Sequence, residues 1–176
     1  MSSLAPVVAL RANAMRAICF AFGLLALSTP LATAKEPIKW TLSRHGGSAI
    51  EIPAFIADGN TRLLKGGGKY GLIFDSKEYG VEFSQYKVVD GSNKRPIEYV
   101  YDQVLPRGSS ITYELDKPFV GAISVEIPGE ISYIYYNMCR KNHNTTVCFD
   151  ISSRKKDQKL FGPIVERIVN SFRKNR

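Results

Sequence analysis

The sequence predicts an α+β domain, with one antiparallel β-sheet of about seven to eight strands covered by a short central helix and a C-terminal amphipathic helix. The first observation is a series of short segments in which apolar and polar residues alternate, as along half-buried strands. The second is a change to apolar residues spaced three and four apart, at residues 95–105 and again near the C-terminus. The third is a pair of cysteines placed to close a hairpin.

Residues 1–34 have the features of a secretory signal peptide that is removed from the mature protein. The apolar run at residues 17–27 is too short to span a bilayer. Ala32-Thr33-Ala34 follows it with the small-x-small form of a cleavage site. We therefore expect residues 35–176 to form a single domain, periplasmic or secreted, with no transmembrane segment after signal cleavage.

The formal net charge of the chain is +8, and residues 1–34 contribute only arginines to it and no acidic residue. The expected mature domain is therefore basic, which favours anionic surroundings such as lipid head groups, cell-wall polymers or an acidic protein. The alternative is a charged surface that only keeps the protein soluble. Nucleic acid is not an expected partner, because export is expected and no basic-aromatic motif is present.

Six segments before the cysteine hairpin alternate in polarity and are expected to form strands: residues 35–42, 48–52, 70–74, 79–89, 111–115 and 119–127. Trp40 is the expected core anchor of the first. Residues 54–68 contain turn formers and three consecutive glycines, which predicts an irregular segment. Halfway along residues 79–89 the pattern of apolar residues shifts, which predicts a β-bulge or a twist of the strand near Ser84-Gln85.

Two helices are predicted. Residues 95–105 have helical spacing of apolar residues, and Pro96 suits a first helical turn. The C-terminal segment has the clearest amphipathic pattern in the chain. Pro163 is expected in its first turn, so the regular helix should begin near Phe161. Because a one-sided helix cannot bury its apolar stripe alone, we expect it to lie on the sheet.

The hairpin before this helix is expected to have arms at residues 131–139 and 147–151, which are rich in β-branched and aromatic residues. Residues 140–145 are polar and basic, and they are expected to form its tip. The hairpin is the nearest surface on which the C-terminal helix can dock.

Cys139 and Cys148 are predicted to form a disulfide across this hairpin. Cys19 lies inside the expected signal, so two cysteines remain in an oxidising compartment. A disulfide that closes a loop of about ten residues contributes roughly 2–3 kcal/mol in the chain-entropy account. The alternative is a metal site with His143 between the cysteines, but a structural zinc site needs four ligands. We expect no metal and no cofactor.

The layout, the segment Ile50-Glu51-Ile52-Pro53 and the C-terminal segment 163–173 (PIVERIVNSFR) resemble small exported proteins of alphaproteobacteria, which in turn resemble the PsbP/Mog1-like α-β-α sandwich. The similarity covers most of the mature chain and rests on packing motifs. It implies a non-enzymatic accessory or binding domain and carries over no catalytic residue. The cysteine hairpin is not matched to that pattern.

Arg44-His45-Gly46 follows the first predicted strand and resembles the strand-end motif of histidine phosphatases. That resemblance implies His45 as the phosphoryl acceptor and Arg44 as the group that holds the phosphate. The chemistry also requires a second histidine and further arginines. His143 is the other histidine of the chain, and it is expected on the hairpin tip. A solvated turn histidine is the simpler interpretation.

Candidate binding residues gather on the hairpin: Tyr133, Tyr135, Tyr136, Arg140 and Lys141. Tyrosine is favoured at recognition surfaces, because its ring is apolar while its hydroxyl prefers water. The alternative is sheet packing, since Tyr133 and Tyr135 share one face of a strand while Tyr136 lies on the other.

The sequence therefore favours a non-catalytic exported accessory or binding domain, whose partner is an envelope protein or an anionic polymer or lipid surface. A second hypothesis is a small phosphatase-like hydrolase that uses Arg44 and His45. A third is a structural assembly factor of an envelope complex.

Overall fold

The structure is a computed structural model and describes residues 37–89, 93–102, 106–142 and 145–174. The chain divides into two compact units, of which the second, Glu36–Arg176, contains all of these residues. The expected signal peptide at residues 1–34 lies outside the described residues. None of the described helices is long and apolar enough to cross a membrane.

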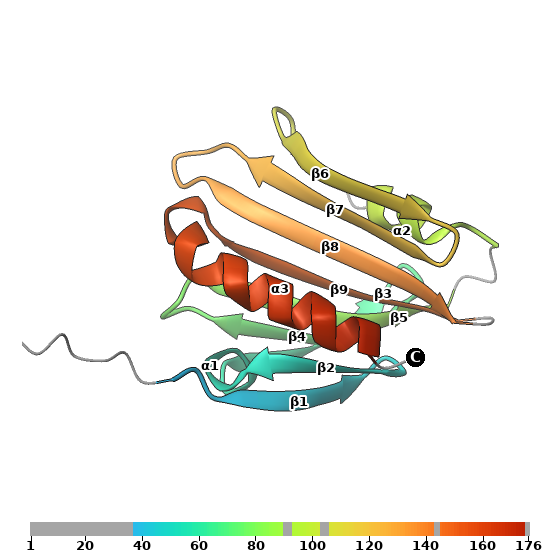
Figure 1. Ribbon diagram of the computed structural model, residues 1–176, viewed down its shortest axis with the longest axis horizontal. Coiled ribbons are helices and arrows are strands. Elements are labelled where there is room, and N and C mark those ends of the chain that lie inside the picture. The colour runs from blue at the N-terminus through green and yellow to red at the C-terminus, as the bar shows by residue number, and fades with distance from the viewer. Residues whose placement is uncertain (1–36, 90–92, 103–105, 143–144, 175–176) are drawn as a thin grey trace, which may run out of the picture. The chain divides into compact units, whose positions relative to one another are not determined.

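Nine strands and three α-helices make up the described unit (Figure 1). In chain order they are β1 (Trp40–His45), β2 (Ser48–Pro53), α1 (Ala54–Ala57), β3 (Asn60–Gly66), β4 (Lys69–Ser76), β5 (Val81–Val88), α2 (Pro96–Tyr101), β6 (Ser110–Lys117), β7 (Val120–Ile127), β8 (Tyr133–Asn142), β9 (Thr145–Arg154), a 3-10 turn (Lys155–Asp157) and α3 (Gln158–Lys174). Seven strands form an antiparallel sheet in the order β3-β4-β5-β9-β8-β7-β6, and β1 with β2 forms a separate hairpin. The predicted α+β class is confirmed.

Helix α3 lies across one face of the seven-stranded sheet, beside the β1–β2 hairpin (Figure 1). Its apolar stripe of Phe161, Ile164, Ile168 and Phe172 is buried there against the central strands. Phe83 of β5 and Phe149 of β9 are fully buried beneath it. The one-sided periodicity of α3 is therefore satisfied by packing on the sheet, as expected.

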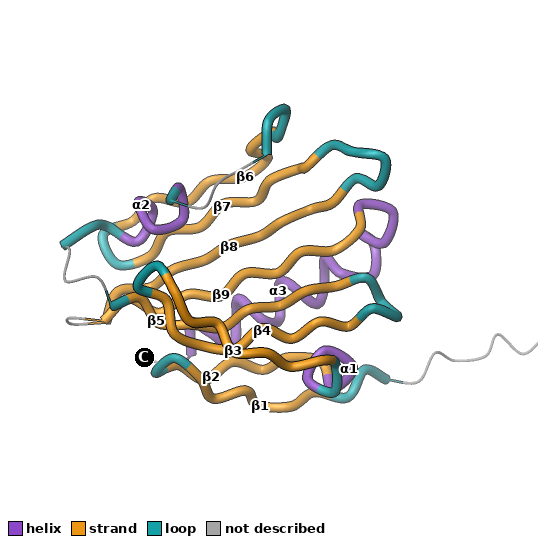
Figure 2. The backbone as a smooth tube through the Cα atoms, turned by 180° about the vertical axis from the view of Figure 1, so that it is seen from behind, coloured by secondary structure: helices purple, strands orange, loops and turns teal. Residues whose placement is uncertain are grey.

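Helix α2 lies on the opposite face, over one end of β6, β7 and β8 (Figure 2). Ile97 and Val100 of α2 are buried there in a second, smaller apolar cluster. Gly121 of β7 allows this close approach, because a Cβ atom at that position would lie 2.3 Å from the backbone nitrogen of Ile97. The short helix covers only part of this face.

The prediction that residues 54–68 are irregular is wrong, because they contain α1 and β3. Strand β3 is an edge strand that pairs only with β4 in the described sheet. Most of its side chains are exposed on both faces. An edge strand of this kind lacks the apolar alternation by which a buried strand is recognised in a sequence.

The predicted bulge near Ser84-Gln85 is also wrong. The pairing of β5 with both β4 and β9 continues through these residues without a shift. The apolar phase is interrupted because Gln85, which is 0% exposed, takes an inward position that an apolar residue would normally fill. A register shift does occur elsewhere, between β6 and β7 at Ile111 and Tyr113.

The helix bounds differ from those predicted. Helix α2 is shorter, Pro96–Tyr101, and residues 103–105 lie outside the described residues. Helix α3 begins at Gln158 after a 3-10 turn, so Pro163 lies in its second turn instead of its first. Pro163 is exposed, so the helix tolerates the loss of one backbone hydrogen bond on its solvent side.

Candidate functional site

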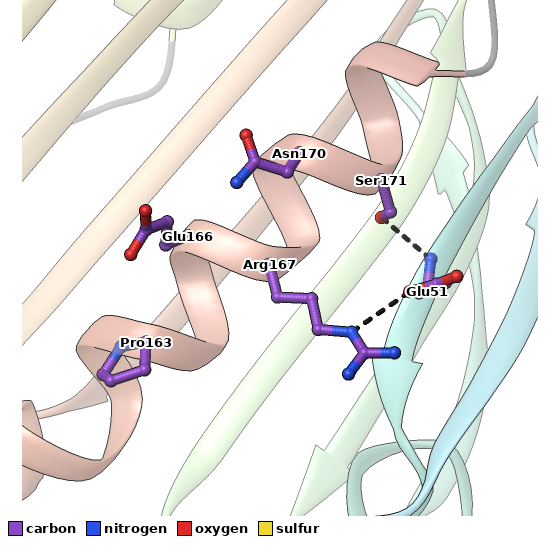
Figure 3. A pocket seen from close by; sticks show the side chains of 6 residues that line it. All are labelled: Glu51, Pro163, Glu166, Arg167, Asn170 and Ser171. Carbon is purple, nitrogen blue, oxygen red and sulfur yellow. Dashed lines mark hydrogen bonds and ion pairs between the residues drawn. The ribbon is translucent and has the colours of Figure 1, made fainter.

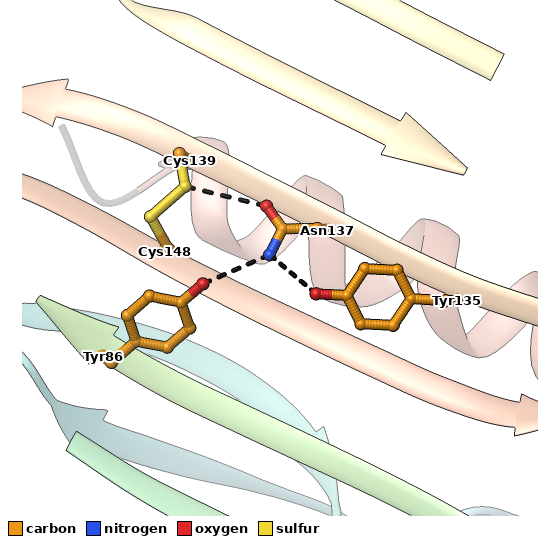
Figure 4. Close-up of a disulfide and its surroundings, with 5 residues drawn as sticks. All are labelled: Tyr86, Tyr135, Asn137, Cys139 and Cys148. Carbon is orange, nitrogen blue, oxygen red and sulfur yellow. Dashed lines mark hydrogen bonds between the residues drawn. A yellow bond between two sulfur atoms is a disulfide. The ribbon is translucent and has the colours of Figure 1, made fainter. Parts of the chain in front are cut away.

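The hairpin of β8 and β9 is paired along its whole length, and Cys139 directly faces Cys148. Their sulfur atoms lie 2.04 Å apart, at disulfide distance, and both residues are fully buried (Figure 4). The predicted cysteine pairing is thus observed. The predicted tip is too long, however, because β8 extends to Asn142 and makes Arg140 and Lys141 strand residues.

Beside the disulfide, on the face that α2 partly covers, lies a group of polar side chains. We call it the Asp150 cluster, and it consists of Lys69 (β4), Ser84 and Tyr86 (β5), Tyr135 and Asn137 (β8) and Asp150 (β9). The strand register brings it together, because Asp150 faces Asn137 on one side and Ser84 on the other. Residues far apart in sequence therefore form one polar row across the centre of the sheet.

Asn137 organises the tyrosines of the cluster. Its Nδ2 donates hydrogen bonds to the hydroxyl oxygens of Tyr86 and Tyr135, each at 3.2 Å (Figure 4). The side chains of Ser84 and Tyr86 are hydrogen-bonded to the carboxyl group of Asp150. Asn137 is fully buried, whereas Asp150 and Tyr135 are half-buried. The cluster thus combines a fully buried, hydrogen-bonded Asn137 with an Asp150 residue that is only partly exposed.

The surroundings of the cluster shift the protonation of its members. Burial raises the pKa of Asp150 to about 6, although the hydrogen bond from Ser84 and the charge of Lys69 act in the opposite direction. Burial also raises the pKa values of the Tyr86 and Tyr135 hydroxyls above their usual range, so both remain protonated. A carboxyl group that changes charge near neutral pH is typical of functional sites.

Lys69 enters the cluster from the start of β4. Its Nζ lies 5.3 Å from the centroid of the Tyr86 ring, within the range of a cation–π interaction. Burial lowers the pKa of Lys69, and the attraction of Asp150 opposes this effect. Gly71 makes the arrangement possible, because a Cβ atom there would lie 2.7 Å from the Cβ of Tyr86.

The hairpin residues proposed for binding fall into separate environments. Tyr135 belongs to the Asp150 cluster, and Tyr133 lies on the same face, half-buried. Tyr136 packs on the α3 side, with its ring 5.9 Å from that of Phe149. Arg140 is only 7% exposed, so it is not an available contact surface.

The Arg140 side chain instead contacts the C-terminal end of helix α3. Its guanidinium group donates to the backbone oxygen of Phe172 and lies 5.3 Å from the centroid of the Phe172 ring. The hydrogen bond to the backbone oxygen is typical of a basic side chain at a helix C-terminus. Lys141 is half-buried and hydrogen-bonds to Asn93, 2.6 Å away. We therefore assign a packing role to Arg140.

The Arg44-His45 motif lies at the end of β1. Neighbouring strand residues point to opposite faces, so the two side chains cannot converge on one phosphate group. The His45 ring lies against Phe74, with centroids 6.2 Å apart, and Arg44 is exposed. His143, the second histidine, lies outside the described residues. The geometry of the motif does not support the hydrolase hypothesis.

The turn that contains this motif has a structural role. Gln85 Nε2 donates to the backbone oxygens of His45 and Ser48, at 3.1 and 3.0 Å, and Gln85 Oε1 accepts from Ser43 Oγ at 2.6 Å. Gly46 has a φ of +58°, and a Cβ atom there would lie 2.6 Å from the backbone nitrogen of Lys87. The turn therefore packs directly against the backbone of β5.

A polar hollow of about 440 Å³ lies between α3 and β2 (Figure 3). Arg167 Nε donates to Glu51 Oε2 at 3.1 Å, and its guanidinium group lies 4.1 Å from the centroid of the Trp40 ring. Ser171 Oγ accepts a hydrogen bond from the backbone nitrogen of Glu51 at 3.0 Å. These polar groups join α3 to the β1–β2 hairpin, so we assign them to packing.

A second hollow, of about 600 Å³, lies where β9 passes into α3. We call it the basic hollow, and it is lined by Glu130, Ile131, Ser132, Arg154, Lys155, Lys156 and Gln158. Its volume is in the range of ligand sites. Lys155 is paired with Glu126, and Arg154 Nε lies 2.7 Å from Asp157 Oδ2. The three consecutive basic residues Arg154, Lys155 and Lys156 line it, together with the exposed side chain of Ile131.

The Asp150 cluster is the part of the site that sequence reasoning missed. Its members stand on four separate strands, and only the register of β4, β5, β9 and β8 brings them together. One signal was present in the sequence. Asp150 is a single carboxylate between Phe149 and Ile151, in an arm rich in β-branched and aromatic residues.

The fold defines an antiparallel α+β domain with helices on both faces of its main sheet. Neither a family model nor a curated protein sequence matches the chain. Among solved structures, the cyanobacterial PsbP of Synechocystis is similar with a TM-score of 0.51 and 14% identity, over 81% of this chain and 97% of that one. This likeness supports the expected fold and shows the fold alone.

Two further solved structures are similar at lower scores. The Ran-binding protein Mog1p of Saccharomyces cerevisiae has a TM-score of 0.47 and 9% identity, over 77% of this chain and 95% of that one. A Pseudomonas aeruginosa protein of unknown function has a TM-score of 0.41 and 16% identity, over 74% and 93%.

Proposed function

We propose that the protein is a non-catalytic accessory domain that is exported and binds an anionic component of the cell envelope at the basic hollow. The observation that carries this proposal is the meeting of Arg154, Lys155 and Lys156 around one hollow of ligand size. The signal-like residues 1–34 and the formal charge of +8 support the same interpretation.

The ion pairs around the hollow do not prevent anion binding. The side chain of Lys155 is 47% exposed and that of its partner Glu126 is 34% exposed. An exposed ion pair of this kind contributes only about 0–1 kcal/mol, so an incoming phosphate or carboxylate can replace Glu126 at small cost. Lys156 is exposed as well. Ile131, which is 56% exposed, adds an apolar contact at the rim.

Binding to vesicles tests the proposal. The mature protein should sediment with vesicles that contain anionic phospholipid and not with zwitterionic vesicles, and salt should weaken the binding. An anionic polysaccharide forms a second arm, which separates a polymer from a lipid surface. The double variant Lys155→Glu/Lys156→Glu should bind at least about tenfold more weakly, because each residue near an anionic surface contributes about 1 kcal/mol.

The matched control is Lys65→Glu/Lys117→Glu, which makes the same charge change at exposed positions on the edge strands β3 and β6. It should retain binding within about twofold to threefold, in keeping with weak contributions from distant screened charges. Equal losses in the two double variants would show a general charge effect, and they would refute a site at the basic hollow. Absence of binding in both arms would refute the proposal as a whole.

A further inference from the structure

We propose that the Asp150 cluster is a second binding site, built for an organic ammonium group, and that the ammonium of Lys69 occupies it in the free protein. This goes beyond the proposed function, because the site has the opposite charge preference and different residues. The ligand can be a free amine or the side chain of a lysine in another protein. Both sources present the same chemical group.

The position of the Asp150 carboxyl group is fixed by its neighbours. Asp150 is half-buried in the middle of the sheet, and the side chains of Ser84 and Tyr86 on the neighbouring strand β5 hold its carboxyl group by hydrogen bonds. Such a carboxylate has a fixed direction, which suits a charge-assisted hydrogen bond from an ammonium group. Hydrogen bonds to charged groups are stronger than neutral ones, so a single preorganised carboxylate can select its ligand.

The surroundings of Asp150 are aromatic. Tyr86 and Tyr135 flank Asp150, and Asn137 fixes both hydroxyl groups. Aromatic faces attract cations, and a carboxylate next to such faces is a typical combination for recognition of ammonium groups. Tyr133 continues the row on the same face of β8 and is half-buried. The alkyl chain of a ligand can therefore lie along tyrosine rings.

The cluster already receives an ammonium group from the same chain. Lys69 Nζ lies over the Tyr86 ring and is attracted by Asp150. Lys69 follows Gly66, Gly67 and Gly68, all with φ between +55° and +150°. A turn of three glycines loses more conformational entropy on ordering than other turns do. Withdrawal of Lys69 in favour of a ligand is therefore energetically accessible.

The charged groups around Asp150 agree with a preference for cations. On β5, Glu82 lies on the same face of the sheet and raises the pKa of Asp150, and Arg62 of β3 pairs with Glu82 at 2.7 Å. On β4, Lys69 is the opposing cation, and Asp102 beyond α2 also attracts it. The tyrosines of β5 and β8 stay neutral. An incoming ammonium would therefore replace Lys69 without leaving a new unpaired charge.

The burial of Asp150 supports a binding role. Because burial raises the pKa of this carboxyl group, keeping it ionised at neutral pH lowers the stability of the folded protein. An asparagine would fit the hydrogen-bonding row without that cost. Charged groups kept at the expense of stability are typical of functional sites.

The test is a titration of the mature protein at pH 7.5, followed by amide chemical shifts. One arm uses 1,5-diaminopentane, and the other uses a capped short peptide with one central lysine. Lys69→Met removes the internal competitor and should tighten binding by roughly tenfold, because the site is then open in the whole population. Asp150→Asn should weaken binding by at least about tenfold.

The matched controls are Lys65→Met on the same β3–β4 hairpin and Asp75→Asn on the same face of β4. Each should leave the dissociation constant within about threefold. The wild-type protein gives an independent measurement, because its binding should weaken as the pH falls from 7 to 5 and Asp150 takes up a proton.

Opposite effects of Lys69→Met and Asp150→Asn support the site. Binding of both probes indicates a site for amines in general, and binding of the peptide alone indicates a protein partner. No tightening in Lys69→Met would overturn the inference, since Lys69 would then be a structural cation. Unchanged binding in a folded Asp150→Asn protein would overturn it as well, and so would unchanged wild-type binding between pH 7 and 5.

Discussion

The two faces of the seven-stranded sheet come from the same alternating strands, yet they bury different kinds of side chain. Toward α3, strands β5 and β9 present Phe83 and Phe149, which pack with Phe172 of the helix. Toward the other face, the same two strands present Ser84, Tyr86 and Asp150. The first face follows the apolar pattern that stabilises a fold, whereas the second departs from it at the centre of the sheet.

The difference separates residues that maintain the structure from residues that are available for function. Burying an apolar side chain under α3 stabilises the fold without requiring a specific interaction geometry, because the hydrophobic effect is non-directional. A buried polar row is tolerated only when every member is hydrogen-bonded, so it demands an exact arrangement and gives little stability. Departures from consistent local patterning are most often found at functional sites. The two faces should therefore respond differently to substitution.

The largest effect is expected on the α3 face. Phe149→Ala should lower the free energy of unfolding by about 3–5 kcal/mol, because it leaves a cavity in a packed core. The ring of Phe149 lies 6.0 Å from that of Phe83 and 5.2 Å from that of Phe172. Urea denaturation measures the loss.

Phe119→Ala is the control for this substitution. Phe119 is 68% exposed, so its removal should change the stability by no more than about 0.5 kcal/mol. Similar losses for the two variants would contradict the assignment of the main core to the α3 face.

A smaller effect is expected from the disulfide, which lies on the second face. Replacement of Cys139 and Cys148 by alanine should lower the stability by roughly 2–3 kcal/mol, the entropy of closing a loop of about ten residues. The fold should persist, because β8 and β9 remain paired along their length and neither cysteine belongs to the core under α3. Thermal unfolding followed by circular dichroism measures the change.

Reduction of the wild-type protein should reproduce this loss, and reductant should not affect the double variant. Free thiols at both positions in the protein recovered from its natural compartment would contradict the predicted pairing.

The contrast between the faces also explains what the sequence predicts and what it leaves out. The stripe of α3 and the apolar phases of β5 and β9 are local patterns, so they predict the main face directly. The pairing of Cys139 with Cys148 follows from the hairpin alone. Strand β3 was not predicted, because the side chains of an exposed edge strand do not alternate between apolar and polar.

Residues with long-range partners could not be assigned from local patterns. Gln85 looked like a break in its strand, but it is an inward side chain whose partners lie on the β1–β2 hairpin. Arg140 looked like a surface residue because its partner Phe172 lies 32 positions away. The proposed role of Asp150 depends on side chains from β4, β5 and β8. The order of strands that brings these side chains together is a tertiary property, which local sequence patterns do not predict.

The smallest of the predicted stability effects concerns the pH dependence that Asp150 confers on the second face. Its pKa rises from the ordinary 3.8 to about 6 in the folded protein, so the folded state binds this proton more tightly than the unfolded state. The contribution of Asp150 to stability is therefore fully present below about pH 4, and it is lost as the pH rises through about 6. For a half-buried group we expect a loss of about 2 kcal/mol over this interval.

Asp150→Asn should abolish this part of the pH dependence, so the variant should gain stability relative to the wild type by about 2 kcal/mol between pH 4 and pH 7. Urea denaturation at a series of pH values measures the difference. Glu166→Gln, at an exposed position of α3, is the control and should run parallel to the wild type. A wild-type protein that gains stability over Asp150→Asn as the pH rises would show that the carboxylate strengthens the sheet. The second face would then be a stabilising network, and the contrast between the two faces would fail.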